Sequence, residues 1–325
     1  MTTALLCSHE YELCGEICSQ DVAVLRLLLA VLHTIFSRVD VNGVPLPCRS
    51  EENALEIWKE LQKMGHFPQK PILEYLQKWH ERFWLFHPER PFAQIAGLDI
   101  GTKYSSAKLN GEISESTNKK RLFSPYYGAE KNSLTYAQAT RWLLCLNAFD
   151  DSSGKPSQRQ AGKKISAGIG WLGKIGVICW KGKTLFETLL FNLVLVNRNG
   201  MNVKECPSWE KETISMQESE IIPEPDNLSE LYTMQSRKIL LIRSQEKVTG
   251  FISIKGDFFP EIHLKTEPMT AWIPLENAYI PKQHMDKIYL WKDIHFLWFC
   301  LLNYTFFNTI FRFHPGLLLL FYYLR

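Results

Sequence analysis

Residues 152–186 form a strongly basic, glycine-rich stretch that lies between two predicted helices. The stretch contains seven lysines and arginines, seven glycines and no acidic residue, whereas the whole chain is nearly balanced, with 37 basic and 34 acidic residues. Cationic side chains attract polyanions, and glycine lets backbone N–H groups approach phosphates closely. The stretch is therefore interpreted as a phosphate-contacting loop, with a solvated, flexible surface loop as the alternative.

Capping boxes on both sides indicate that this loop is held in place. One box begins at Thr135 and predicts a helix at 136–148, and a second begins at Thr184 and predicts an apolar helix at 185–196. Between them, the apolar run at 177–180 predicts a short buried strand. A loop fixed at both ends by buried helices is better suited to binding than a free linker.

Other helices are predicted nearer the N-terminus. Apolar residues at helical spacing predict a helix at 21–37, capped by Asp21, and another at 51–64, ended by Gly65. A third helix is predicted to begin at Pro71, because proline is favoured in the first turn.

Strand signals are fewer, and they set the fold class as α+β. Two alternating runs at 237–243 and 248–255 predict an antiparallel hairpin. Residues 99–133 are polar and irregular, and an irregular segment of that length is usually functional or mobile. With 325 residues and 46% hydrophobic content, the chain can bury a large core in one or two domains.

Short motif matches in the basic stretch do not support nucleotide binding. Gly168–Gly173 matches G-x-G-x-x-G, but a basic segment precedes it and a strand, not a helix, is predicted after it. A P-loop match fails because Ile175 stands where Ser or Thr must bind magnesium. The sequence has no nucleophile elbow, no H-E-x-x-H and no paired cysteines of the kind that bind zinc. We therefore expect no enzyme, no cofactor, no metal site and no small-molecule substrate.

Cysteine usage and the C-terminal residues bear on location. The eight cysteines are scattered and several lie in apolar runs, which is typical of a reducing cytoplasm. The apolar segment 22–36 contains Arg26 and His33, so it predicts a core helix instead of a signal peptide. Residues 294–325 form an apolar tail whose interruptions leave it short of one span of about 20 residues. The tail keeps open a second function, that of a membrane-tethered interaction protein.

Six segments occur in an order that one known family shares. Each segment is weak alone, but the ordered set across about residues 20–293 resembles the CasA family, the large subunit of the type I-E CRISPR surveillance complex Cascade. The segments are His87–Gln94, Ala139–Leu144, Gly168–Gly173, Thr184–Val194, Leu231–Arg237 and Glu267–Trp272.

The resemblance implies a non-catalytic DNA-binding subunit of an antiviral defence complex. Such a subunit recognises the protospacer-adjacent motif, while base pairing with the guide RNA reads the rest of the target. The implied partners are double-stranded target DNA, the guide-RNA-containing Cascade subunits and the helicase-nuclease that the subunit helps to recruit. Residues 1–293 would be the N-terminal DNA-recognition domain, with mixed helices and antiparallel strands. The tail at 294–325 does not resemble the expected C-terminal four-helix bundle, which leaves open a truncated, impaired product.

The family's DNA-contacting elements are carried over position by position. An aromatic-bearing loop corresponds to about 122–134, with Phe123 as its aromatic, and a glycine loop corresponds to 162–168. A lysine that probes the minor groove corresponds best to Lys255, with Lys265 as the rival. The glycine-loop residues implied to face DNA are Gly162, Lys163, Lys164 and Gly168.

Overall fold

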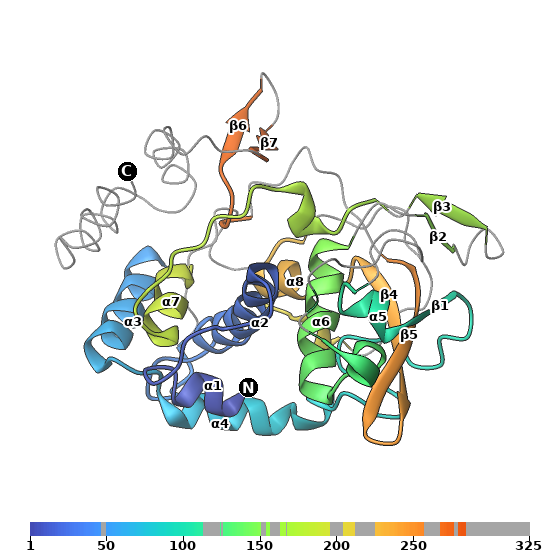
Figure 1. Cartoon of the computed structure of the whole chain (residues 1–325). Helices are drawn as coiled ribbons and strands as arrows, with labels where there is room; N and C mark the ends of the chain where they lie inside the picture. The colour runs from blue at the N-terminus through green and yellow to red at the C-terminus, as the bar shows by residue number, and fades with distance from the viewer. Residues whose placement is uncertain are drawn as a thin grey trace.

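The structure is a computed structural model. It describes residues 1–46, 50–112, 124, 126–150, 154–156, 163–166, 168–195, 204–211, 225–256, 267–275 and 279–283. In this part of the chain, helices gather on one side and a small antiparallel sheet lies on the other (Figure 1). The α+β class expected from the sequence is confirmed. The tail at 294–325 lies outside the described residues, so the domain boundary at 293 stays a prediction.

Helix α2 (Cys18–Phe36) is the central core helix. It begins three residues before the predicted start, and Asp21 is not its cap, so that part of the prediction was wrong. The Asp21 carboxylate lies inside the first turn and accepts the backbone N–H of Gly15 at 2.7 Å. By length and composition α2 could cross a membrane, but 78% of its most apolar window is buried inside the protein. That burial confirms the core helix expected at this position.

The remaining helices surround α2 or cover the sheet (Figure 1). Helix α3 follows its predicted signals, because the Ser50 hydroxyl accepts the Asn53 N–H at 3.2 Å and Gly65 ends it with φ +70°. Helix α4 begins at Gln69, two residues before Pro71. The helices are α1 (Thr2–Leu6), α3 (Glu51–Met64), α4 (Gln69–Lys78), α5 (Ser106–Leu109), α6 (Tyr136–Phe149), α7 (Leu185–Asn192), α8 (Leu228–Thr233), and the 3-10 turns η1 (His80–Phe83), η2 (Gly128–Asn132), η3 (Trp171–Lys174) and η4 (Ser208–Glu210).

The sheet has three antiparallel strands in the order β1-β5-β4. Strands β4 (Arg237–Ser244) and β5 (Lys247–Lys255) form the predicted hairpin, and β1 (Thr102–Ser105) pairs with the other side of β5. Strand β1 was not predicted, because its four residues lack an apolar pattern and its partner is distant in sequence. Two short hairpins complete the strands: β2 (Gly154–Pro156) with β3 (Lys164–Ser166), and β6 (Trp272–Pro274) with β7 (Tyr279–Pro281).

The predictions for two elements that meet at Asn192 were wrong. Its side-chain amide accepts the N–H of Trp180 at 3.0 Å and donates to the Trp180 carbonyl at 2.7 Å. These bonds satisfy the backbone N–H and carbonyl of Trp180. Earlier in the run, the Ile178 N–H donates to the Met269 carbonyl at 2.9 Å and Val177 forms an isolated bridge with Thr270, so the pairing does not extend into a strand. Helix α7 ends at Asn192, so its predicted continuation to 196 was also wrong.

Candidate nucleic-acid interface

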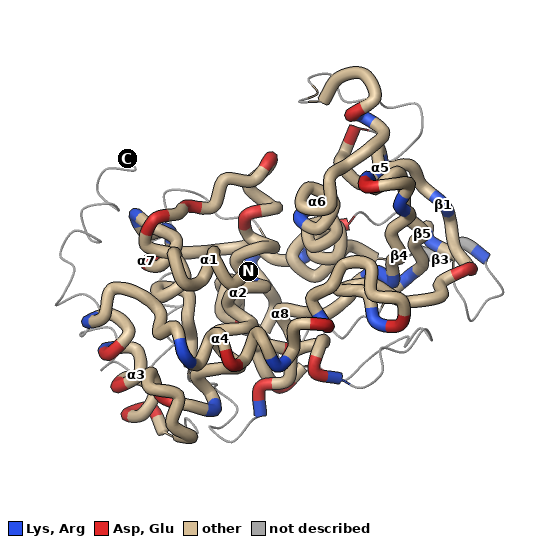
Figure 2. Tube along the Cα trace, turned by 90° about the horizontal axis from the view of Figure 1, so that it is seen from below, with Lys and Arg blue, Asp and Glu red and all other residues tan. Residues whose placement is uncertain are grey.

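The basic stretch 152–186 does not form one continuous surface. Its last lysines lie beside α7, whereas its first part forms the β2–β3 hairpin on the far side of the molecule (Figure 1). Lysines and arginines also lie along β1, β3 and β5 when the protein is seen from below (Figure 2). Among the described residues of the stretch, the β2–β3 hairpin and the adjoining Gly168 are therefore the part that shares a side with the sheet.

The β2–β3 hairpin contains the centre of the predicted glycine loop. Gly154 pairs with Ser166 and Pro156 with Lys164, so the two strands form a regular antiparallel ladder. Lys163 directly precedes β3 and is exposed. The backbone of Lys164 is part of β3, while its side chain and the whole of Gly162 lie outside the described residues.

Lys155 contributes nothing to a solvated basic surface. Its side chain is 3% exposed, and its Nζ lies 3.3 Å from Oδ2 of Asp150, the residue that ends α6. The same carboxylate oxygen accepts Nε of Arg237 at 2.5 Å. Counting every lysine of the stretch as phosphate-facing therefore overestimates the charge that is available to a ligand.

Gly168 lies where the chain leaves the hairpin and returns to the core. Its φ of +69° is in the left-handed region that glycine adopts at little cost, and its carbonyl accepts Nη2 of Arg237 at 2.6 Å. Gly170 follows against the end of α6, where an added Cβ would lie 2.5 Å from the Ala148 carbonyl oxygen. Trp171 and Leu172 are then buried. Gly170 is therefore needed for close packing against α6, and it is not placed to contact a phosphate.

Lys255 is the last residue of β5 and lies close to the hairpin. It is opposite Arg237 in the strand register, and its side chain is half-buried. Strand β2 packs against β5, so this end of β5 and the hairpin share one side of the molecule (Figure 1). The structure thus brings Lys163, Gly168 and Lys255 into one region. The rival Lys265 lies outside the described residues.

The loop predicted at about 122–134 is described at 124 and 126–134, whereas Phe123 itself lies outside the described residues. Ser124 fixes the start of this loop to the fold, because its hydroxyl donates to Oε1 of Glu112 at 2.5 Å and accepts the Tyr126 N–H at 2.9 Å. The next residue, Tyr127, is 76% exposed. It is an aromatic side chain available to a ligand, and the resemblance to the family did not single it out.

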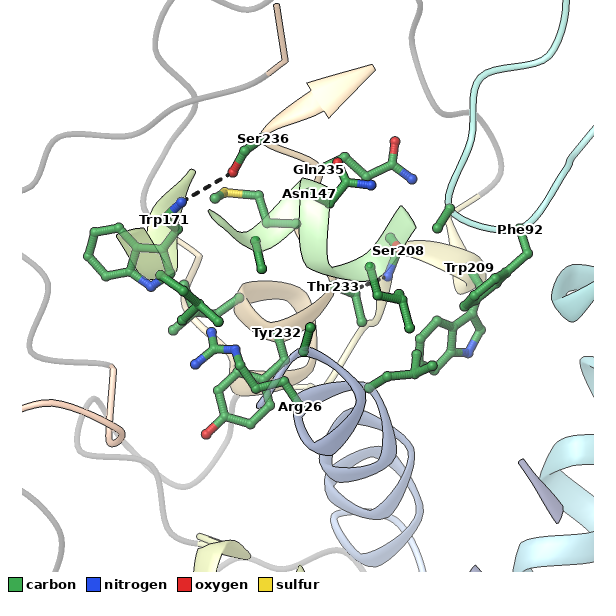
Figure 3. A pocket seen from close by; sticks show the side chains of 18 residues that line it. Arg26, Phe92, Asn147, Trp171, Ser208, Trp209, Tyr232, Thr233, Gln235 and Ser236 are labelled. Atoms are coloured by element: carbon green, nitrogen blue, oxygen red, sulfur yellow. Dashed lines mark hydrogen bonds between the residues drawn. The ribbon is translucent and has the colours of Figure 1, made fainter. Parts of the chain in front are cut away.

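A small cavity lies between α2, α6 and α8 (Figure 3). Its volume is about 50 Å³, and the side-chain amide of Gln235 on its wall has no hydrogen-bond partner among the described residues. That volume suits water molecules, whereas pockets for drug-sized ligands occupy about 300 Å³ or more. No group of three metal-binding side chains occurs among the described residues.

Two groups important to the site were missed from the sequence. Asp150 and Arg237 are distant in sequence, and although Arg237 ends one of the family segments, no pattern in the sequence pairs it with Asp150. The sequence does show Arg237 and Lys238 at the start of an apolar strand, and in the structure both side chains are buried. A charged side chain that is buried needs a partner, which points to a tertiary ion pair without identifying it.

Comparison with known proteins places these features in a family. The family model described as CRISPR-associated protein Cse1 matches residues 3–304. A CasA/Cse1 protein of Thermus thermophilus is 35% identical over 208 residues, which make up 64% of this chain and 37% of that protein.

Solved structures agree with the sequence comparison. Cse1 of Thermobifida fusca superposes with a TM-score of 0.72 at 28% identity, over 88% of this chain and 55% of that one. A chain of a CRISPR RNA-guided surveillance complex superposes with a TM-score of 0.67 over 90% of this chain and 58% of that one, and its 18% identity shows the fold alone. The chain therefore spans little more than half the length of these relatives.

Proposed function

Because this chain belongs to the CRISPR-associated Cse1 (CasA) family, we propose that it is a non-catalytic, DNA-binding subunit of a type I-E Cascade complex in the cytoplasm. In this role it recognises the protospacer-adjacent motif on double-stranded target DNA and aids loading of the target beside the guide RNA. Its other partners are the guide-RNA-containing Cascade subunits and the helicase-nuclease that it helps to recruit. Sequence reading beyond the motif is left to base pairing.

One observation carries the proposal from family to residues. The exposed Lys163 beside β3 and Lys255 at the end of β5 lie on the same side of the fold, where the hairpin packs against the sheet. Two cations on adjoining elements can neutralise phosphates of one duplex, and such contacts position a protein on DNA. The glycine loop and Lys255 are accordingly assigned to the phosphates and to the minor groove of the motif.

Removing the hairpin lysines tests the phosphate contact. We expect Lys163→Ala with Lys164→Ala to weaken duplex binding, because a phosphate that is no longer neutralised keeps its counterion. The slope of log association constant against log salt should become shallower by about 2 units. Binding of fluorescent duplexes across a salt series measures it. Lys181→Ala with Lys183→Ala is the matched control, since it removes the same charge beside α7. An unchanged slope in the hairpin variant would contradict the assignment.

Lys255→Ala tests motif reading separately. A residue that probes the groove contributes differently to different base pairs, so we expect discrimination between duplexes with different flanking motifs to fall by about tenfold. Competition binding with a panel of flanks gives the ratio of affinities. Lys247→Ala, at the exposed other end of β5, is the control. A loss of affinity that is equal for every flank would instead place Lys255 on phosphates alone.

A further inference from the structure

The base of the hairpin is closed by a buried ionic cluster. Asp150, Arg237 and Lys155 have side chains that are 5%, 0% and 3% exposed, and both cations meet the same oxygen, Oδ2 of Asp150. Three buried charges are costly to remove from water, and a purely structural hairpin base could be apolar. Their position between the two candidate DNA-contacting elements suggests what they do.

Arg237 fixes the end of the loop where the chain returns to the core. Its Nη2 donates to the Gly168 carbonyl at 2.6 Å, while its Nε holds Asp150. The Asp150 carbonyl in turn accepts the Gly170 N–H at 2.9 Å. The planar guanidinium, with its fixed fork of donors, therefore joins the end of α6 to the residues that follow β3.

Lys155 fixes the other end of the loop to the sheet. It lies in β2, and besides the Asp150 carboxylate its Nζ lies 5.9 Å from the ring centre of Tyr104 in β1. The Tyr104 ring stacks on Phe251 of β5 at 5.1 Å. Both ends of the hairpin are thus tied to the three-stranded sheet. Lys255, the last residue of β5 in that sheet, is opposite Arg237.

We propose that Asp150, Arg237 and Lys155 form a buried ionic latch that positions the β2–β3 hairpin relative to Lys255, so that both elements meet one DNA duplex together. The inference rests on the proposed function, since it assumes that the hairpin and Lys255 contact DNA. The three latch residues are positioning residues, because buried side chains do not reach phosphates themselves. They act by fixing the two ends of the loop.

Lys155→Met tests the latch with a readout that a merely structural role would not move. The methionine keeps most of the buried stem and removes a cation that cannot touch phosphate. We expect duplex affinity to fall about tenfold and the salt slope to become shallower by about 1 unit, because the displaced hairpin neutralises fewer phosphates. Binding is measured with the 325-residue chain, well below the unfolding midpoint of each variant. Lys155→Arg, which keeps the charge, should restore the salt slope of the parent chain. If Lys155→Met fails to fold, Lys155→Gln takes its place.

A combined variant separates the latch from the proposed function. If the latch acts through the hairpin, adding Lys155→Met to Lys163→Ala and Lys164→Ala should flatten the slope no further, because the two hairpin lysines that neutralise phosphates are then already absent. A flattened slope in the hairpin variant, together with an unchanged slope and affinity in Lys155→Met, would overturn the latch and leave the proposed function standing. Unchanged slopes in all variants would overturn both.

Discussion

Replacing Glu267 with alanine is expected to lower the free energy of unfolding by about 3–5 kcal/mol, because it leaves a buried cation without its carboxylate. The Glu267 side chain is fully buried, and its Oε1 lies 2.9 Å from Nη1 of Arg26 in α2. The same carboxylate accepts the indole N–H of Trp171 at 2.9 Å and the backbone N–H of Met269 at 3.0 Å. Denaturant unfolding of the variant and the parent chain measures the difference.

A double-mutant cycle shows whether the loss comes from the uncompensated charge. Arg26→Met together with Glu267→Met should recover part of the stability, since a buried ion pair can often be replaced by apolar groups at little cost. Recovery will be incomplete, because the double variant still removes the Glu267 carboxylate that accepts the indole N–H of Trp171. Glu12→Ala is the control, as the Glu12–Lys181 pair is 3.8 Å long and exposed, and such pairs contribute about 1 kcal/mol or less. A Glu267→Ala loss no greater than this control would contradict the argument.

The local parts of the fold were predictable because their causes lie within a few residues. The Ser50 cap, the Gly65 end of α3 and the capping box at Thr135 each depend on contacts between near neighbours. The β4–β5 hairpin follows from alternation around a short turn in which Gln245 has φ +54°. Each of these elements formed where its own residues favoured it.

The errors arose where distant residues decide the outcome. Strand β1 forms because β5 offers it an edge, and its own sequence carries no strand pattern. The strand expected at 177–180 is reduced to an isolated bridge of Val177 with Thr270, and the backbone of Trp180 bonds the side chain of Asn192 instead. Propensity is a weak guide where a tertiary partner can satisfy the backbone in another way.

The candidate site shows the same division. Composition alone located the basic, glycine-rich stretch, but it could not separate the exposed Lys163 from Lys155, which the fold turns inward onto Asp150. Burial of this one lysine lowers the ligand-facing charge, and it also creates the cluster that holds the hairpin. The sequence therefore gives the number of basic residues, whereas the fold determines how many of them are exposed to a phosphate.

Acidification should destabilise the chain through His33, which is buried in α2. Burial, and secondarily the nearby Arg26 guanidinium, lower the pKa of His33 from 6.5 to about 3. Between those values the unfolded chain binds a proton that the folded chain does not, so the free energy of unfolding falls as pH falls through this window. From pH 7 to pH 5 we expect His33 to account for a loss of about 2 kcal/mol. Denaturant unfolding at the two pH values measures it.

His33→Leu isolates this contribution from the other titrating groups. Burial raises the pKa of Glu205, which acts in the opposite direction because its folded form binds a proton more readily than its unfolded form. The imidazole packs edge-to-face on Tyr232, with ring centres 5.6 Å apart, and the Arg26 guanidinium lies 4.0 Å from the same ring, so a proton on His33 would add a second positive charge beside this ring. The variant should therefore lose about 2 kcal/mol less than the parent chain between pH 7 and pH 5. Equal losses in both proteins would mean that His33 stays protonated in the fold or is protonated without cost, and burial beside Arg26 would then not control its charge.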